Sequence, residues 1–92
     1  MIKSFKHGGL RRFYETDSKA GIIPALAKKL RNQLSVLDVA TKPSDMDRSG
    51  WKLHPLTGKL AGFWSISVNG NWRLTFRFTG VDVEIVDYRD YH

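Results

Sequence analysis

The chain has 92 residues, enough for one domain spanning residues 1–92 and too few for a second hydrophobic core. It has no cysteine, which excludes disulfides and thiolate metal sites. Fifteen Lys and Arg against nine Asp and Glu give a net charge of +6, a balance typical of nucleic-acid-binding domains. No apolar run approaches the roughly 20 residues of a membrane span, and no secretory signal is visible, so we expect a cytoplasmic protein.

The first half of the chain predicts one short strand and two helices. Residues 1–5 are expected to form the strand, and Gly8 and Gly9 end it. His7, beside these glycines, is expected to be exposed and inert. Helical spacing of apolar residues predicts a short helix around residues 10–14 and a longer one over 24–40. The longer helix carries an apolar stripe made of Ile23, Leu26, Leu30, Leu34 and Leu37.

The second half changes to the alternating period of β-strands. We expect strands over residues 51–55, 62–69, 72–79 and 81–92, with Val83 and Ile85 facing inward in the last. Asn69-Gly70-Asn71 has the composition of a hairpin turn. The predicted order β-α-α-β-β-β-β indicates an α+β fold, an antiparallel sheet with two N-terminal helices packed on one face.

Alternation along these strands predicts a polar face on the sheet, opposite the helices. Its members from the first three strands and the start of the last are Lys52, His54, Ser65, Ser67, Arg73, Thr75, Arg77 and Glu84. Continuing the alternation adds Tyr88, Asp90 and His92. Val86 is apolar at a position where this alternation expects a polar residue, so it breaks the pattern in the final strand.

This set of side chains suits RNA cleavage without a metal. Attack of a ribose 2′-OH on the adjacent phosphate needs a base and an acid, and unperturbed imidazoles titrate near pH 6.5. An arginine can stabilise the charge that develops on the phosphate, Asp90 can orient a histidine, and Tyr91 can donate a hydrogen bond or stack on a base. Each residue also has an ordinary structural interpretation, as a strand end, an edge charge or a core side chain. A metal site of His54, Asp90 and His92 has no recognised ligand spacing.

Three segments extend the argument: WKLHPLTG at residues 51–58, GFWSISVNGNWRLTF at 62–76 and VDYRDYH at 86–92. Together with MIKSF at residues 1–5, they resemble the HigB branch of the RelE/ParE toxin superfamily over the whole chain. The resemblance implies a RelE-like fold and the toxin of a type II toxin–antitoxin system. It also implies a cofactor-free, ribosome-dependent endoribonuclease that cuts mRNA in the ribosomal A site and produces a cyclic phosphate.

The resemblance also assigns roles to individual residues. The catalytic candidates that it implies are His54, Arg73, Asp90, Tyr91 and His92. Asn71 is implied to contact a codon base, and further RNA-binding candidates are Lys52, Lys59 and Arg77. A wider basic set is expected to dock ribosomal RNA, namely Lys3, Lys6, Arg11, Arg12, Lys28, Lys29 and Arg31. Related sequences often have a lysine where this chain has Thr57, which leaves the second phosphate-binding cation unassigned.

The implied partners are a HigA-like helix-turn-helix antitoxin, the ribosome with its mRNA, and operator DNA bound only through the antitoxin complex; no membrane is involved. One alternative is a ParE-like toxin that poisons DNA gyrase, which has no need of His54 or the D-Y-H ending. Another is a non-catalytic RNA- or DNA-binding module, which predicts salt-sensitive binding without scission. A third is a toxin of the same family that acts slowly or on ribosome maturation.

Overall fold

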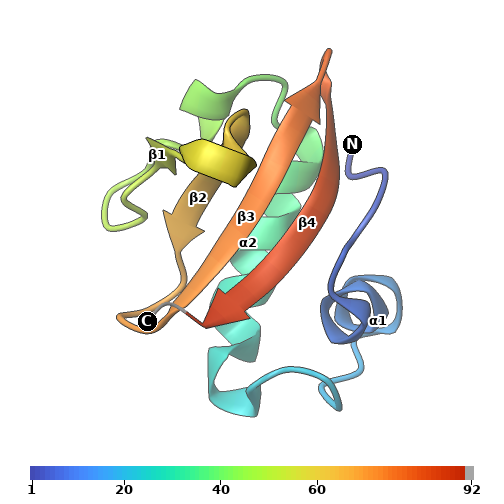
Figure 1. Cartoon of the computed structure of the whole chain (residues 1–92). Coiled ribbons are helices and arrows are strands. Elements are labelled where there is room, and N and C mark those ends of the chain that lie inside the picture. Colours follow the sequence, from blue (N-terminus) through green and yellow to red (C-terminus); the bar gives the residue numbers. More distant parts are fainter. Residues whose placement is uncertain (91–92) are drawn as a thin grey trace.

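The computed structural model describes residues 1–90 and contains an antiparallel sheet with α2 packed across one face (Figure 1). The sheet order within this range is β1-β2-β3-β4, with strands β1 (His54–Pro55), β2 (Phe63–Ser67), β3 (Trp72–Thr79) and β4 (Asp82–Asp90). The α-helices are α1 (Gly8–Thr16) and α2 (Ala27–Val39), and short 3-10 turns are η1 (Pro24–Leu26), η2 (Pro43–Met46) and η3 (Gly58–Leu60). The predicted α+β class is confirmed.

Local sequence signals account for the ends of both helices. α1 begins at a histidine cap, where the backbone N–H of Leu10 donates to Nδ1 of His7 at 3.0 Å. The His7 ring is half-buried and packs edge-on against Tyr88, so the expectation that His7 is exposed was wrong. α2 follows η1, where Pro24 supplies a preset φ. Its predicted stripe is buried at Leu30, Leu34 and Leu37, whereas Leu26 is half-buried and Ile23 is 36% exposed because it precedes the first helical turn.

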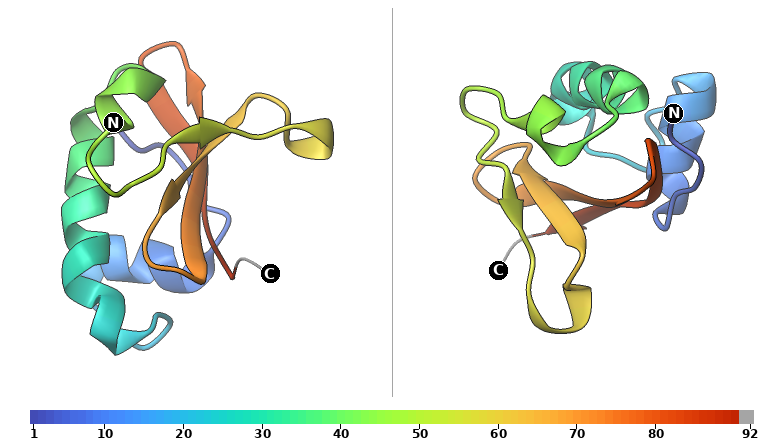
Figure 2. Two further views of the ribbon diagram at one scale, coloured as in Figure 1. Left: turned by 90° about the vertical axis from the view of Figure 1, so that its left-hand side faces the viewer. Right: turned by 90° about the horizontal axis from the view of Figure 1, so that it is seen from above.

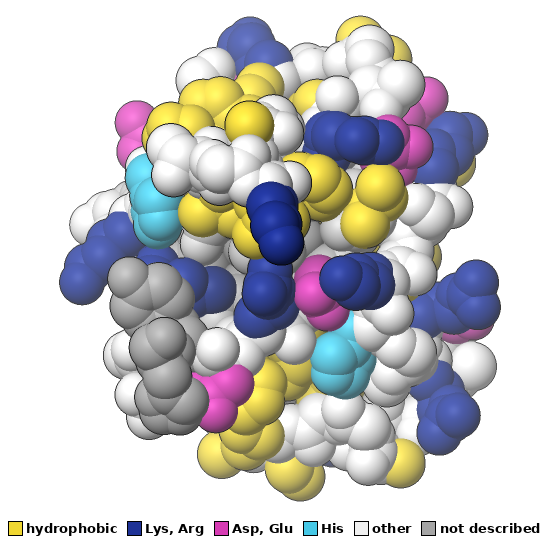
Figure 3. All heavy atoms as spheres, in the orientation of Figure 1, with side chains coloured by type: hydrophobic (Ala, Val, Ile, Leu, Met, Phe, Trp, Pro, Cys, Tyr) yellow, Lys and Arg dark blue, Asp and Glu magenta, His cyan; other side chains and the backbone are white. Residues whose placement is uncertain are grey.

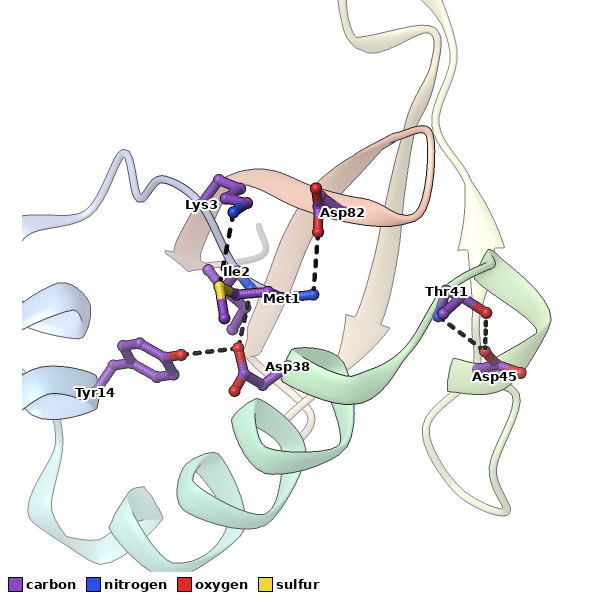
Figure 4. Close-up of polar contacts among 8 residues, drawn as sticks. All are labelled: Met1, Ile2, Lys3, Tyr14, Asp38, Thr41, Asp45 and Asp82. Atoms are coloured by element: carbon purple, nitrogen blue, oxygen red, sulfur yellow. Dashed lines mark hydrogen bonds and ion pairs between the residues drawn. The ribbon is translucent and has the colours of Figure 1, made fainter.

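The N-terminal segment runs parallel to β4 along the edge of the sheet. Two isolated bridges, Ile2 with Val83 and Phe5 with Val86, replace the expected full strand. The carboxylate of Asp38 on α2 accepts hydrogen bonds from the backbone N–H of Ile2 at 2.9 Å and from the Tyr14 hydroxyl at 2.8 Å (Figure 4). Burial, together with the Asp38 carboxylate, raises the pKa of Tyr14 to about 12. Asp38 therefore ties the N-terminal segment, α1 and α2 together.

A bulge divides β4 into two parts. The register shifts between Thr75 and Arg77 of β3, and Ile85 opposite this shift has a φ of 55°. This left-handed conformation is strained for a β-branched residue, at a cost on the order of 1–3 kcal/mol. The backbone N–H of Ile85 donates to the Ser4 hydroxyl at 2.8 Å, so the N-terminal segment satisfies the bulged residue.

The bulge reverses the alternation of the strand after Ile85. Val86 and Tyr88 are buried on the helix side, with Tyr88 stacked on Trp72 at a ring-centroid distance of 4.5 Å. The expectation that Tyr88 lies on the open face was therefore wrong, and Ile85 is half-buried at the bulge instead of being an ordinary inward residue. The predicted alternation fails because it counts one residue per pleat, whereas a bulge inserts an extra one.

The core lies between α2 and the inner face of the sheet. Leu30 and Leu37 of α2 and Ile66, Leu74 and Phe76 of the sheet are fully buried there. The Gln33 side chain, also fully buried, donates through Nε2 to the carbonyl oxygen of Ser67 at 2.8 Å. This contact fixes α2 to the end of β2, at the hairpin. None of the helices within residues 1–90 has the length and hydropathy needed to cross a bilayer.

Candidate active site

A pocket of about 240 Å³ lies on the face of the sheet opposite α2, which we call the open face. The connection between β1 and β2, which includes η3, projects from this face away from the helices (Figure 2, left). Leu56 and Leu60 of this connection contribute one wall of the pocket. The pocket is lined by His54, Leu56, Leu60, Ser65, Arg73, Thr75, Arg89 and Asp90. Its volume is below the roughly 300–1,000 Å³ of pockets that enclose a small molecule. It therefore suits one part of a larger molecule lying over the sheet.

The strand register explains why these side chains meet. Directly opposed residues of an antiparallel sheet share a face, so partners line up across the strands. One polar row crosses all four strands through His54, Ser65, Thr75 and Asp87. The next row contains Ser67, Arg73 and Arg89. Residues 35 positions apart in the sequence are thereby brought into one pocket.

His54 is half-buried at the wall of the pocket. Its Nδ1 lies 3.0 Å from the carbonyl oxygen of Lys52, whose φ of 52° is in the left-handed region. A carbonyl oxygen can only accept, so this hydrogen bond requires the proton on Nδ1. In the neutral ring Nε2 is then the nitrogen that can take up a proton. The contact thus leaves Nε2 as the ring nitrogen that can exchange a proton with a bound molecule.

Two arginines face the pocket from neighbouring strands. Arg73 on β3 is half-buried and lies directly opposite Arg89 on β4. Arg89 is 48% exposed, and its Nε lies 3.9 Å from a carboxylate oxygen of Asp87, a long contact for an ion pair. Asp90 follows at the end of β4 and also lines the pocket. The structure therefore brings three of the five predicted catalytic residues, His54, Arg73 and Asp90, into one pocket.

Arg77, four residues along β3 from Arg73, has a different environment. Its Nε donates to a carboxylate oxygen of Glu84 at 2.9 Å, and its guanidinium lies over the ring of Phe63. The Thr79 hydroxyl, and then Arg77, lower the pKa of Glu84 below its usual value. Arg77 is therefore neutralised locally and does not line the pocket.

The other predicted site residues lie around the pocket or beyond the described range. Asn71 is exposed at the hairpin tip, where its backbone N–H donates to the Asn69 side chain at 2.9 Å. Lys52 and Lys59 are exposed on the connections flanking β1. Tyr91 and His92 lie outside the described residues. Within residues 1–90, no three His, Asp or Glu side chains are close enough together to hold a metal ion.

Arg89 is the main residue of the pocket that the sequence pattern missed. Strict alternation places Tyr88 on the open face, and the bulge at Ile85 replaces it with Arg89. The apolar Val86 at an expected polar position was the available signal. The apolar wall formed by Leu56 and Leu60 was also missed, because it depends on how the connection after β1 folds back.

Basic side chains extend beyond the pocket. Figure 3 shows the open face, with Lys and Arg side chains spread over it and along the margins of the molecule and fewer acidic groups between them. With a net charge of +6, such a surface attracts a polyanion by long-range electrostatics. The pocket and its surroundings together suit a phosphate-bearing chain.

Sequence comparison identifies the family. A family profile described as the RelE-like toxin of the type II toxin–antitoxin system HigB matches residues 3–92. Endoribonuclease HigB of Proteus vulgaris is 42% identical over 92 residues, covering all of both chains. Toxin HigB-1 of Vibrio cholerae serotype O1 is 35% identical over 94 residues, covering all of this chain and 98% of the relative.

Solved structures show the same fold at lower identity. YafQ from E. coli superposes with a TM-score of 0.67 and 16% identity, covering 98% of this chain and 91% of YafQ. The YoeB/ParE toxin from Agrobacterium tumefaciens gives 0.65 and 17%, with full coverage of both chains. The YoeB–YefM complex from Staphylococcus aureus gives 0.62 and 20%, covering all of this chain and 95% of the matched chain. These findings confirm both the RelE-like fold and the resemblance inferred from the sequence motifs: the chain belongs to the HigB family of RelE-like toxins of type II toxin–antitoxin systems.

Proposed function

We propose that this toxin is a ribosome-dependent endoribonuclease that cleaves mRNA in the ribosomal A site and so inhibits translation. The observation that carries the proposal is the open-face pocket, which combines an acid–base imidazole, a guanidinium and a carboxylate. The name and 42% identity of the Proteus vulgaris relative support the class of reaction.

The chemistry needs no cofactor. The 2′-oxygen of a ribose attacks the adjacent phosphorus, and the bond from phosphorus to the 5′-oxygen of the next nucleotide breaks. The products are a 2′,3′-cyclic phosphate and a free 5′-hydroxyl. One group takes the 2′-OH proton and another protonates the departing 5′-oxygen. Nε2 of His54 can serve either as this base or as this acid. Arg73 stabilises the charge that develops on the phosphate oxygens, and Asp90 orients a neighbouring acid–base group.

The remaining sequence-derived roles complete this proposal. His92 shares the proton transfers with His54, and Tyr91 donates a hydrogen bond or stacks on a base. Asn71 contacts a base from the hairpin tip. Lys52 and Lys59 bind the RNA backbone around the pocket, with a smaller contribution from Arg77, which is paired with Glu84, while the wider basic surface docks ribosomal RNA.

Membership of a type II family implies an antitoxin partner. We assign this role to a HigA-like helix-turn-helix protein, and the complex, not the toxin alone, binds operator DNA. The whole chain, residues 1–92, acts as one domain in the cytoplasm, where translating ribosomes are found. The YoeB–YefM toxin–antitoxin complex from Staphylococcus aureus is a precedent for a toxin of this fold bound to an antitoxin.

Primer extension on one mRNA tests the proposal, with purified toxin added with and without translating ribosomes. We expect cuts in codon phase only when ribosomes are present. Cuts on naked RNA would support a nuclease but contradict ribosome dependence. Absence of cuts in both reactions would favour a gyrase poison, to be checked by a supercoiling assay, or a binding module without catalysis.

A further inference from the structure

We propose that Arg89, Arg73 and Ser65 form a binding subsite for the scissile phosphate, in which Arg89 is the second cation. The proposal rests on the proposed function, in which Arg73 already stabilises this phosphate. It adds a residue that neither the sequence motifs nor the comparisons assign to the site.

The first support is the opposition of two like charges. Arg73 and Arg89 are direct partners across β3 and β4, where side-chain Cβ atoms lie about 4.5–5.5 Å apart. Like charges in this position destabilise a sheet. The Asp87 carboxylate lies 3.9 Å from Nε of Arg89, a longer contact than the 2.9 Å hydrogen bond from Arg77 to Glu84 on the same sheet. An anion between the two guanidiniums would turn this repulsion into two charge-assisted contacts. A phosphate group accepts hydrogen bonds from two arginine forks at once.

The second support is a buried hydroxyl in the same pocket. Ser65 is fully buried, and its Oγ has no hydrogen-bond partner within residues 1–90. A buried hydroxyl without a partner is costly, and in a native protein it requires an explanation. Ser65 lines the pocket together with both arginines, beside His54 in the strand register. A phosphate oxygen in the pocket would accept the missing hydrogen bond.

The third support is the position of the other cations. Thr57 carries no charge, and neither it nor Lys59 lines the pocket among the described residues. Arg89 supplies a positive charge from β4, on the opposite side of the pocket from the connection that carries Thr57 and Lys59. The positive charge that the resemblance places after His-Pro-Leu is therefore delivered from another element of the fold.

The binding test uses the isolated toxin and inorganic phosphate, without ribosomes or RNA. In NMR titrations the Nε–H signals of Arg73 and Arg89 are expected to shift with one common dissociation constant. Arg89→Gln should weaken phosphate binding by about tenfold, the loss of one hydrogen bond to a charged group. Arg89→Lys keeps the positive charge but loses the planar guanidinium. Its phosphate affinity should therefore lie between those of the wild type and Arg89→Gln. Arg48→Gln, an exposed arginine that stacks over Trp51, removes the same charge elsewhere and should leave binding unchanged.

The Ser65→Ala variant distinguishes a phosphate-binding role of Ser65 from a purely structural one. If Ser65 binds phosphate, the variant weakens phosphate binding severalfold while its melting temperature is unchanged or raised, because an unsatisfied hydroxyl has been removed. A lower melting temperature with unchanged phosphate binding would overturn this role. A shift of Arg73 alone, or equal affinity in Arg89→Gln, would overturn the subsite.

A cleavage assay then connects the subsite to RNA. Single-turnover cleavage at saturating toxin should slow about tenfold in Arg89→Gln and remain at the wild-type rate in Arg48→Gln. Phosphate binding that depends on Arg89, with cleavage that does not, would overturn the assignment to the scissile phosphate. If the wild-type toxin binds phosphate through both arginines but cuts no RNA, the anion subsite stands and the proposed function fails.

Discussion

The two arginines of β3 on the open face occupy contrasting environments only four residues apart. At one end of the strand Arg77 faces Glu84, which is also bonded to Thr79, and the charges balance within the protein. At the other end Arg73 faces Arg89 beside His54, and the two guanidiniums line one pocket. The difference shows that a basic residue on this sheet is not by itself a site. What distinguishes the pocket is that two guanidiniums from neighbouring strands lie beside an imidazole.

The bulge at Ile85 creates this contrast. Before it, β4 presents Glu84 to β3, and after it the strand presents Asp87 and Arg89 on the same face. Without the bulge, uninterrupted alternation would place even-numbered residues on the open face throughout. The strained φ of Ile85 is thus associated with the placement of a charged side chain in the pocket.

The largest effect is expected from His54→Asn at the pocket end. Asparagine can still donate to the Lys52 carbonyl, but it cannot carry a proton between oxygens. Single-turnover cleavage on programmed ribosomes should fall about 10²- to 10⁴-fold. His7→Asn is the matched control, because asparagine is also a good helix cap and His7 is outside the pocket. Normal cleavage by His54→Asn would remove the imidazole from the mechanism.

The comparison is tested directly by neutralising each arginine of β3. Arg73→Gln should slow cleavage about 10²- to 10³-fold, as expected for loss of a group that stabilises transition-state charge. Arg77→Gln should slow it by less than about tenfold, because Arg77 is already engaged with Glu84. The two single-turnover rates, measured on the same ribosomes, provide the check. Equal losses of cleavage rate in the two variants would mean that the Arg77–Glu84 ion pair does not reduce the contribution of Arg77 to cleavage.

A smaller effect is expected from Ser4→Ala, which removes the acceptor for the bulged N–H of Ile85. The loss should cost about 1 kcal/mol of unfolding free energy. For a domain of this size, that corresponds to a melting temperature lower by about 4–8 °C. Ser49→Ala, at an exposed loop position, serves as the control. An unchanged melting temperature in Ser4→Ala would show that the bulge is held by something else.

The smallest effect is expected in the titration of Glu84, at the end of β3 where it is paired with Arg77. Its pKa is lowered in the folded protein, so its contribution to stability is present above its usual value of 4.5 and is lost as the pH falls through the folded value. NMR of the side-chain carboxyl carbon should give a midpoint below 4.5. Thr79→Val and Arg77→Gln should each move the midpoint upward, with Thr79 giving the larger change. A midpoint that ignores both substitutions would contradict the assigned cause.

The sequence alone was sufficient for the class of fold and for much of the pocket. Apolar spacing identified α2 and its buried stripe, and alternation placed His54, Ser65, Arg73 and Thr75 on one face. These predictions succeed because helical and strand periods are local properties that burial enforces. The motifs shared with the HigB toxins carried the functional reading, since charge and spacing alone leave several chemistries open.

Tertiary structure decided the rest. The hydrogen bond from Nδ1 of His54 to the Lys52 carbonyl depends on the left-handed backbone of Lys52, which the strand pattern of the sequence does not predict. The reversal of β4, which buries Tyr88 and presents Arg89, depends on a bulge whose N–H is satisfied by Ser4, 81 residues away. The bulge arises from a contact between distant segments, so the alternation of a single strand cannot encode it. Sequence periodicity determined which residues of β2 and β3 share a face, and the bulge in β4, whose N–H is bonded to the N-terminal segment, determined which charged residue meets Arg73 in the pocket.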